Sequence, residues 1–220
     1  MITAIIPVTG ELKSQKLVLS DVGGRPLIQW TIQAAQHCSY VDRIIVTTSD
    51  SDVLDVAQNC GAEALEQSAY PSEGGDYSTQ STIRAVNSLD VVPDKVLMLP
   101  ATTPFRNSVD IGTVVRYLNS GSTSVVGVEM LGISLDSLRY VTDSRLKCFR
   151  DVVNVHKQGF NDALYAVNGA IYGAEWRVLK TEQTFHIDNA AAYFMTPLAS
   201  INVNVYDRID IARRLARNLN

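Results

Sequence analysis

The feature that most constrains the fold is a repeated alternation of short apolar runs with stretches of helical periodicity. Residues 2–7 and 43–48 are mostly apolar and show no polar face, which is typical of strands buried on both faces. Between them, residues 26–38 repeat apolar side chains with a 3.6-residue period, which predicts an amphipathic helix. The same alternation predicts helices at 52–59, 78–87 and 109–118 and strands at 62–65, 95–99 and 124–128. Such alternation predicts a parallel sheet with helices on both faces.

The alternation of predicted strands and helices is lost between residues 131 and 164, where charged and aromatic residues are mixed. We interpret this segment as an insert that serves either as a dimer arm or as a solvated lid. The pattern then predicts strands at 168–172 and 200–205 and helices at 175–184 and 206–219. The chain is therefore expected to form one domain over residues 1–220. Its expected fold is a three-layer α/β/α, doubly wound, mostly parallel sheet with a small insert.

Composition excludes several classes of function. The net charge of −4, without a run of basic residues, disfavours a nucleic-acid partner. The apolar stretches are too short to span a membrane, and residues 1–30 lack a secretory signal, so we expect a cytoplasmic protein. The three cysteines, Cys38, Cys60 and Cys148, show no metal-binding spacing and are expected to be small buried hydrophobic residues.

The first predicted strand is followed by a polar, partly cationic loop at residues 8–16. Open α/β sheets bind anionic ligands at such strand ends. The two common phosphate-binding motifs, GxGxxG and GxxxxGK[ST], are both absent here. This absence argues against a dinucleotide-binding oxidoreductase and against a P-loop NTPase.

Six stretches instead match a known family in the same order along nearly the whole chain. They are IIPV (5–8), GGRPLIQWTIQAA (23–35), DRIIVTTSDSDVLDVAQNCGAE (42–63), LMLPATTPFRNSVDI (97–111), VNGAIYGA (167–174) and SINVNVYDRIDI (200–211). With these motifs the chain resembles the CTP-dependent sugar-acid cytidylyltransferases, in particular the acylneuraminate cytidylyltransferase (CMP-sialic acid synthetase) family. The resemblance implies a homodimer that transfers CMP from CTP to a nine-carbon, sialic-acid-like sugar acid and releases pyrophosphate.

The resemblance also implies a role for individual residues. Those expected to bind the nucleotide are Val8, Thr9, Gly10, Lys13, Lys16, Asp76 and Ser78. Those expected to bind the sugar are Thr102, Thr103, Asn168, Tyr172, Tyr193 and Phe194. Lys16 and Arg106 are the expected catalytic cations, because charge develops on phosphoryl oxygens during the transfer. The expected Mg²⁺ site is at Asn202 and Asn204, where the family carries two aspartates.

The chain departs from the family pattern at the positions expected to bind the metal, the phosphates and the substrate. Two asparagines bring no negative charge, so Mg²⁺ binding should be weak or absent unless Asp188 or Asp207 replaces them. Glu11 adds a negative charge to the phosphate loop, and Pro100 replaces a substrate-facing glutamine. Three hypotheses therefore stay open: an active cytidylyltransferase, a catalytically degenerate relative that binds a nucleotide, a sugar or a protein, and a transferase that uses another nucleotide.

Several of the site residues also have a structural interpretation. Asn168 is equally consistent with a turn before a strand, and Tyr172 with a core position. Arg106 is consistent with a helix cap or a pair with Asp110, and Asp76 with a helix cap. For these residues the sequence leaves both interpretations open.

Overall fold

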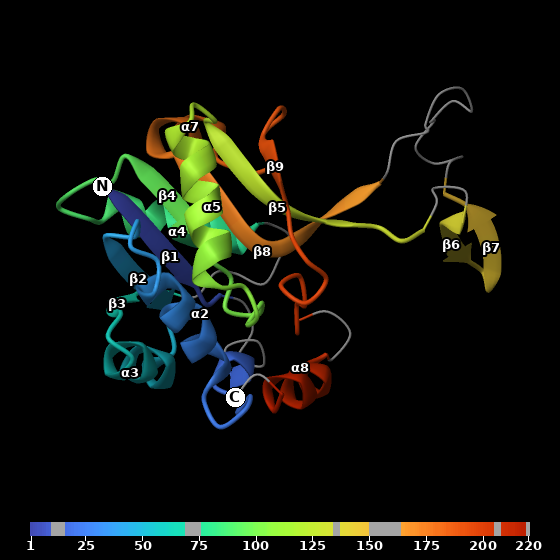
Figure 1. Ribbon diagram of the computed structural model, residues 1–220, viewed down its shortest axis with the longest axis horizontal. Coiled ribbons are helices and arrows are strands. Elements are labelled where there is room, and N and C mark those ends of the chain that lie inside the picture. Colours follow the sequence, from blue (N-terminus) through green and yellow to red (C-terminus); the bar gives the residue numbers. More distant parts are fainter. Residues whose placement is uncertain (10–15, 69–75, 134–136, 150–163, 205–207, 219–220) are drawn as a thin grey trace.

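A seven-stranded sheet covered by helices on both faces forms the body of the molecule in a computed structural model of the chain (Figure 1). The structure describes residues 1–9, 16–68, 76–133, 137–149, 164–204 and 208–218. The strands of the sheet are β1 (Ile2–Pro7), β2 (Arg43–Thr48), β3 (Glu63–Glu66), β4 (Lys95–Met98), β5 (Ser124–Met130), β8 (Tyr165–Glu175) and β9 (Ala191–Phe194). The helices are α2 (Leu27–Gln36), α3 (Ser51–Asn59), α4 (Tyr77–Asn87), α5 (Ser108–Asn119), α7 (Trp176–Glu182) and α8 (Ile209–Ala216).

The strand order is β3-β2-β1-β4-β8-β5-β9. Every neighbouring pair is parallel except the two pairs that β8 makes with β4 and β5. From β1 the chain first builds outward to β2 and β3, and α4 then carries it back to β4 on the other side of β1. The strand order therefore reverses between β1 and β4, which is the position where open α/β sheets bind their ligands.

Alternate side chains of the strands form two separate cores. Ala4 and Ile6 of β1 pack in a cluster with apolar residues of α2, α3 and α5. Ile5, which lies between them, packs in a cluster with residues of α4 and α7 on the opposite face. Because successive strand residues point to opposite faces, a strand covered on both faces shows no alternation of polar and apolar residues. This confirms the three-layer arrangement and explains the continuous apolar runs.

The predicted elements up to residue 128 are all present, with ends shifted by a few residues. Pro26 is the N-cap of α2 rather than its first helical residue. Asp50 caps α3 as expected, since its side chain accepts hydrogen bonds from the backbone N–H groups of Asp52 and Val53. The predicted strand at 168–172 is the centre of the longer β8, which runs antiparallel between β4 and β5.

The strand predicted at residues 200–205 is wrong over the described part of that range. Residues 201–204 form coil and a turn, and the last strand of the sheet is instead β9. The side-chain oxygen of Asn202 accepts a hydrogen bond from the backbone N–H of Asn204 at 3.0 Å. Asparagine side chains that bond nearby backbone in this way compete with the hydrogen bonds of a sheet. The alternating apolar pattern of this segment therefore folds as a turn.

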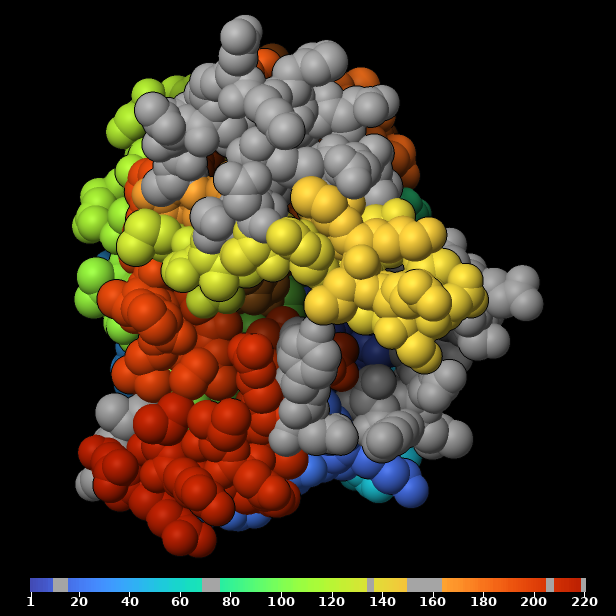
Figure 2. Space-filling view, turned by 90° about the vertical axis from the view of Figure 1, so that its right-hand side faces the viewer, coloured from blue at the N-terminus to red at the C-terminus, as the bar shows by residue number. Residues whose placement is uncertain are grey.

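The predicted insert contains a small sheet of its own. β6 (Arg139–Thr142) pairs antiparallel with β7 (Arg145–Cys148). In Figure 1 this hairpin lies away from the main sheet, beyond the ends of β5 and β8. Figure 2 shows it on the same face of the molecule as the C-terminal residues drawn in red.

Of the cysteines, Cys38 is buried as expected, whereas Cys60 and Cys148 are only half-buried.

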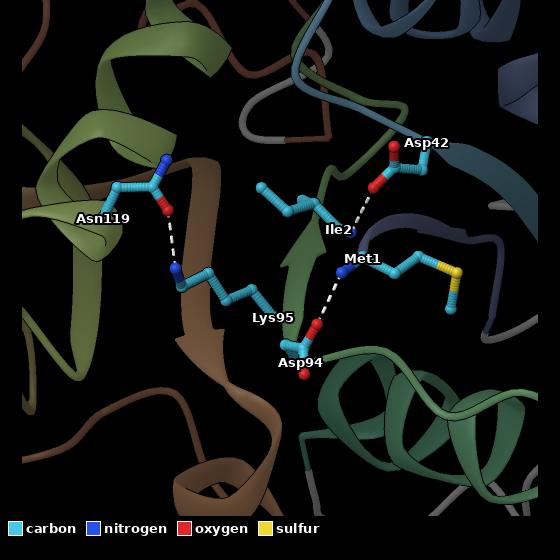
Figure 3. Close-up of polar contacts among 6 residues, drawn as sticks. All are labelled: Met1, Ile2, Asp42, Asp94, Lys95 and Asn119. Atoms are coloured by element: carbon cyan, nitrogen blue, oxygen red, sulfur yellow. Dashed lines mark hydrogen bonds and ion pairs between the residues drawn. The ribbon is translucent and has the colours of Figure 1, made fainter.

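Polar contacts fix the edge of the sheet where β1 and β4 begin (Figure 3). The Met1 amino group forms an ion pair with Asp94 at 2.5 Å, and the Ile2 N–H donates to Asp42 at 2.6 Å. Lys95, at the start of β4, donates to Asn119 at the end of α5 at 2.5 Å. These contacts lie at the amino ends of the strands, opposite the carboxyl ends where open α/β sheets bind ligands. None of the helices in the described ranges has the length and apolar character to cross a membrane.

Candidate functional site

A cavity of about 300 Å³ lies at the carboxyl ends of β1 and β4, where the strand order reverses. Three segments and two further residues line it: residues 7–9 at the end of β1, residues 76–78 at the start of α4, residues 100–102 after β4, and the single residues Val18 and Asn204. These segments are far apart in sequence and meet because parallel strands β1 and β4 end side by side. The cavity is our candidate active site.

The cavity brings together many of the residues predicted from the sequence. Four of the residues expected to bind the nucleotide line it: Val8, Thr9, Asp76 and Ser78. They are joined by Thr102, which was expected to bind the sugar, and by Asn204, which was expected at the metal position. Residues predicted for three different roles thus share one cavity, as a group-transfer site requires.

Asp76 forms the N-cap of α4 at the rim of this cavity. Its carboxylate accepts hydrogen bonds from the Thr79 backbone N–H at 3.1 Å and from the Thr79 hydroxyl. The charge of Asp76 also reaches Tyr172 on the neighbouring β8. Burial and then the Asp76 charge raise the pKa of Tyr172 to about 12. Asp76 is therefore a helix cap that also faces the candidate site, and its role toward the nucleotide stays a prediction.

The segment that carries the two asparagines is bound directly to the loop after β4. The Val203 N–H donates to the Thr102 carbonyl at 2.8 Å, which places Asn204 in the cavity wall. Asn202 lies beside Gly169 of β8, where an added Cβ would come within 2.9 Å of its side-chain nitrogen. The segment predicted to carry the metal position thus reaches the cavity, although it is not a strand.

Asn168 and Thr103 hold this corner of the molecule together. The Asn168 side chain donates to the Ser200 hydroxyl at 2.9 Å and accepts from the Ala170 N–H at 3.0 Å. The Thr103 hydroxyl donates to the Gly169 carbonyl at 3.1 Å. Both residues are buried and neither lies in the cavity wall, so their contacts are those of positioning residues.

Arg106, the second expected catalytic cation, is 1% exposed. Its guanidinium donates to the carbonyls of Pro100 (3.4 Å) and Ala170 and to the hydroxyl of Thr31 (2.8 Å). It therefore connects the loop after β4 to β8 and α2. In this structure Arg106 positions the cavity wall through Pro100 and does not itself line the cavity.

Tyr193 and Phe194 follow one another on β9 and point to opposite faces of the sheet. The Tyr193 hydroxyl donates to Asp110 of α5 at 2.8 Å, and burial together with this carboxylate raises the pKa of Tyr193. Phe194 is 59% exposed and packs edge-to-face against Tyr165 of β8, with ring centroids 4.9 Å apart. Neither lines the cavity, so the structure does not bring this aromatic pair together as one sugar-binding surface.

The remaining predictions fall at the edge of the described region or outside it. Lys16 is exposed and lies two residues before Val18 of the cavity wall. Gly10, Glu11, Lys13 and Asp207 lie outside the described residues. Pro7, Val18, Tyr77 and Ala101 line the cavity but were not predicted to bind a ligand. Pro7 and Ala101 lie at or shortly after the ends of strands and Tyr77 lies beside Asp76, which was the available signal, whereas Val18 had no such signal.

The described residues do not fit a magnesium site on their own. Asp76 is the one carboxylate among the described lining residues, and both of its oxygens accept hydrogen bonds from Thr79. Within the described ranges, no group of three or more His, Cys, Asp or Glu side chains lies close enough together to hold a metal ion. Asn204 adds an uncharged amide, whereas Mg²⁺ prefers charged oxygen ligands.

Known proteins resemble this chain in sequence. The sequence model of the family described as Cytidylyltransferase matches residues 14–196. The CMP-N,N'-diacetyllegionaminic acid synthase of Legionella pneumophila is 27% identical over 175 residues, which cover 75% of this chain and 73% of that protein. The 3-deoxy-manno-octulosonate cytidylyltransferase of Colwellia psychrerythraea is 26% identical over 140 residues, which cover 61% of this chain but only 48% of that protein.

Solved structures share the fold over the whole chain. CMP:2-keto-3-deoxy-manno-octonic acid synthetase complexed with CTP superposes with a TM-score of 0.71 at 14% identity, covering 100% of this chain and 98% of the other. The 4-diphosphocytidyl-2C-methyl-D-erythritol synthase of Anaerococcus prevotii gives a TM-score of 0.67 at 16% identity, covering 97% and 95%. Because the family match extends over most of the sequence, this chain belongs to the cytidylyltransferase family, a nucleotidyltransferase lineage.

Proposed function

We propose that this protein transfers CMP from CTP to a nine-carbon, sialic-acid-like sugar acid and releases pyrophosphate. The observation that carries the proposal is the cavity at the β1–β4 boundary, where Val8, Thr9, Asp76, Ser78 and Thr102 meet. In the reaction, a hydroxyl oxygen of the acid forms a bond to the α-phosphorus, and the bond from that phosphorus to pyrophosphate breaks. The similarity to a CMP-diacetyllegionaminic acid synthase supports the choice of acid.

The cavity suggests how its two substrates would lie. The triphosphate would occupy the side formed by Thr9 and Ser78, since Ser78 lies in the first turn of α4 and helix N-termini favour anions. The sugar acid would approach from the side of Thr102, next to β8. Holding both substrates at one sheet edge supplies the proximity on which phosphoryl-type transfers depend.

An exposed apolar patch supports the proposal of a homodimer. Met130, Tyr165, Val167 and Phe194 lie on the outer ends of β5, β8 and β9, and each is well exposed. In the sheet register, Met130 pairs with Tyr165, while Val128 pairs with both Val167 and Phe194, so the patch is continuous across the three strands. Contiguous apolar surface of this kind marks an interaction site. A second copy of the chain is the proposed occupant.

A specific observation also favours the second hypothesis, a relative that binds ligand without turnover. Asn204 is in the cavity wall where the resemblance predicts a metal-binding aspartate, and the described lining residues hold one carboxylate. If Asp207 does not supply the missing charge, the cavity would bind a nucleotide without the metal that family members use. The two hypotheses differ in turnover, not in fold.

Pyrophosphate release separates these hypotheses. The assay contains CTP, Mg²⁺ and a panel of nine-carbon sugar acids, with ATP, GTP and UTP as alternative nucleotides. The proposal predicts release that depends on both CTP and one of the acids, and a loss of most activity in Thr102→Val. Thr181→Val, at an exposed position of α7, is the matched control and should retain it. Binding of CTP without release from any acid would contradict the transferase proposal and support the degenerate relative.

A further inference from the structure

A second cavity, of about 400 Å³, lies between α2 and the turn that leads into α5. Its wall includes Arg25, Trp30 and His37 from one side and Phe105 and Arg106 from the other. It shares no lining residue with the candidate active site. The sequence resemblance assigns a role to Arg106 alone among these five residues.

The ionisable side chains that line this cavity are all basic. Two arginines and a histidine line it, and none of the described lining residues is an aspartate or glutamate. The start of α5, at Asn107 and Ser108, also forms part of the wall. Helix N-termini carry partial positive charge. The cavity is therefore an electropositive hollow in a protein whose net charge is negative.

Arg106 is a buried cation whose described contacts leave it without an ion pair. The guanidinium donates to two backbone carbonyls and one hydroxyl, all of them neutral. Its Nε atom is buried without a hydrogen-bond partner among the described residues. Burial lowers the pKa of the guanidinium, against the opposing effect of Asp110. A buried charge without an ion pair costs free energy, which the attraction of an anion in the cavity would reduce.

The opposite wall combines a second arginine with aromatic rings. The Arg25 guanidinium lies 3.6 Å from the Trp30 ring centroid, and its Nε is also buried without a described partner. Trp30 in turn contacts Phe105 edge-to-face, with centroids 5.6 Å apart. Gln33 holds Arg25 in place by accepting a hydrogen bond from it. The wall thus offers a fixed cation beside apolar ring surface.

From this combination we infer that the cavity between α2 and the 104–108 turn binds a small organic anion with a flat apolar body. The anionic group lies beside Arg25 and in the field of the buried Arg106, and the apolar body packs against Trp30 and Phe105. Charge-assisted hydrogen bonds from arginine are well suited to carboxylate and phosphate groups. The inference does not depend on the proposed transferase activity.

The two tryptophans provide a direct readout. Trp30 lines the cavity and its indole N–H donates to the Val22 carbonyl at 2.9 Å, whereas Trp176 lies in the core on the opposite face of the sheet. A ¹H–¹⁵N spectrum of the full chain therefore contains one indole signal at the site and one internal control. The probe is phenyl phosphate, compared with benzyl alcohol, which has a ring but no charge. We expect phenyl phosphate to shift the Trp30 signal saturably and to leave the Trp176 signal in place.

Two exposed or half-exposed positions test the charge without disturbing the core. Arg25→Gln should weaken phenyl phosphate binding about tenfold, the usual effect of losing a charge-assisted hydrogen bond. His37→Glu should weaken it by placing a negative charge in the cavity wall. Gln36→Glu places the same charge in the same turn of α2 outside the cavity, and should leave the affinity unchanged.

The outcomes are distinct. A saturable Trp30 shift that Arg25→Gln and His37→Glu weaken, and that Gln36→Glu does not, supports the inference. An unmoved Trp30 signal at millimolar phenyl phosphate would overturn it. Equal binding of benzyl alcohol would also overturn it, because the site would then not select an anion. Unchanged affinity in Arg25→Gln, with the variant folded by circular dichroism, would have the same meaning.

Discussion

At the scale of single residues, Gly169 shows how one missing Cβ lets two segments approach. Gly169 has a φ of +70°, and a Cβ there would lie 2.9 Å from the Asn202 side-chain nitrogen. We predict that Gly169→Ala lowers the free energy of unfolding by about 2 kcal/mol, because it adds left-handed strain and a contact that is too close. Urea denaturation measures the change.

Gly24→Ala is the matched control for this prediction. Gly24 also has a positive φ, +86°, but an added Cβ would meet nothing within 4 Å. The difference between the two variants therefore isolates the contact with Asn202 from the backbone strain. Equal destabilisation by both variants would show that the 202–204 segment does not press on Gly169.

Tyr172 gives a prediction for pH. Burial, followed by the charge of Asp76, raises the pKa of Tyr172 from 10.0 to about 12. Folding therefore favours the neutral phenol, and its contribution to stability is complete below pH 10 and is lost as the pH rises from 10 to 12. Phenolate absorbance, taken as the difference between the wild type and Tyr172→Phe, should show this late titration.

Asp76→Asn should lower the pKa of Tyr172, but not to its ordinary value, because burial remains the larger cause. Asp94→Asn, at the amino ends of the strands, is the control and should leave the titration unchanged. A Tyr172 titration near pH 10 in the wild type would contradict the burial of this hydroxyl beside the α4 cap.

At the scale of elements, Arg106 connects three parts of the fold through its hydrogen bonds to Pro100, Ala170 and Thr31. We predict that Arg106→Met lowers the free energy of unfolding by about 3 kcal/mol, since it leaves several buried acceptors unpaired. Thermal or chemical denaturation measures the loss. Arg177→Met, at an arginine 79% exposed, should cost little. Equal stability of Arg106→Met and the wild type would refute the connecting role.

The sequence predicted most elements because buried strands and amphipathic helices leave strong patterns. The apolar runs of β1 and β2 were found at their observed bounds. The antiparallel direction of β8 was not predictable, because an apolar run carries no mark of its direction. The turn at 201–204 was missed because Asn202 bonds the backbone of Asn204, a local contact that overrides the alternating pattern.

The sequence predicted part of the candidate site, because some of its residues directly follow strands that the apolar pattern identifies. Val8, Thr9 and Thr102 follow strands β1 and β4 directly, and the ends of neighbouring parallel strands meet at one edge. The electropositive second cavity had no such signal, because its walls come from α2, the 104–108 turn and Leu198. Only the packing of these elements shows that Arg25 and Arg106 face the same space.

At the scale of the whole molecule, the apolar patch on β5, β8 and β9 bears on assembly. We predict that the wild type is a dimer and that Phe194→Arg, at the β9 side of the patch where Phe194 packs on Tyr165, makes it monomeric. Val109→Arg, at an exposed position of α5 away from the patch, should remain dimeric. Sedimentation equilibrium measures both masses. A monomeric wild type, or a dimeric Phe194→Arg, would show that this patch is not the interface between two copies.

The measurement that tests the central claim most directly is calorimetric titration of the protein with CTP, with and without Mg²⁺. If the β1–β4 cavity is the nucleotide site, CTP binds one site per chain, and Asn202→Asp combined with Asn204→Asp increases the dependence of binding on Mg²⁺, because Asn204 lines the cavity. Absence of CTP binding at millimolar concentration, in the wild type and in the double variant alike, would contradict the assignment of this cavity to CTP.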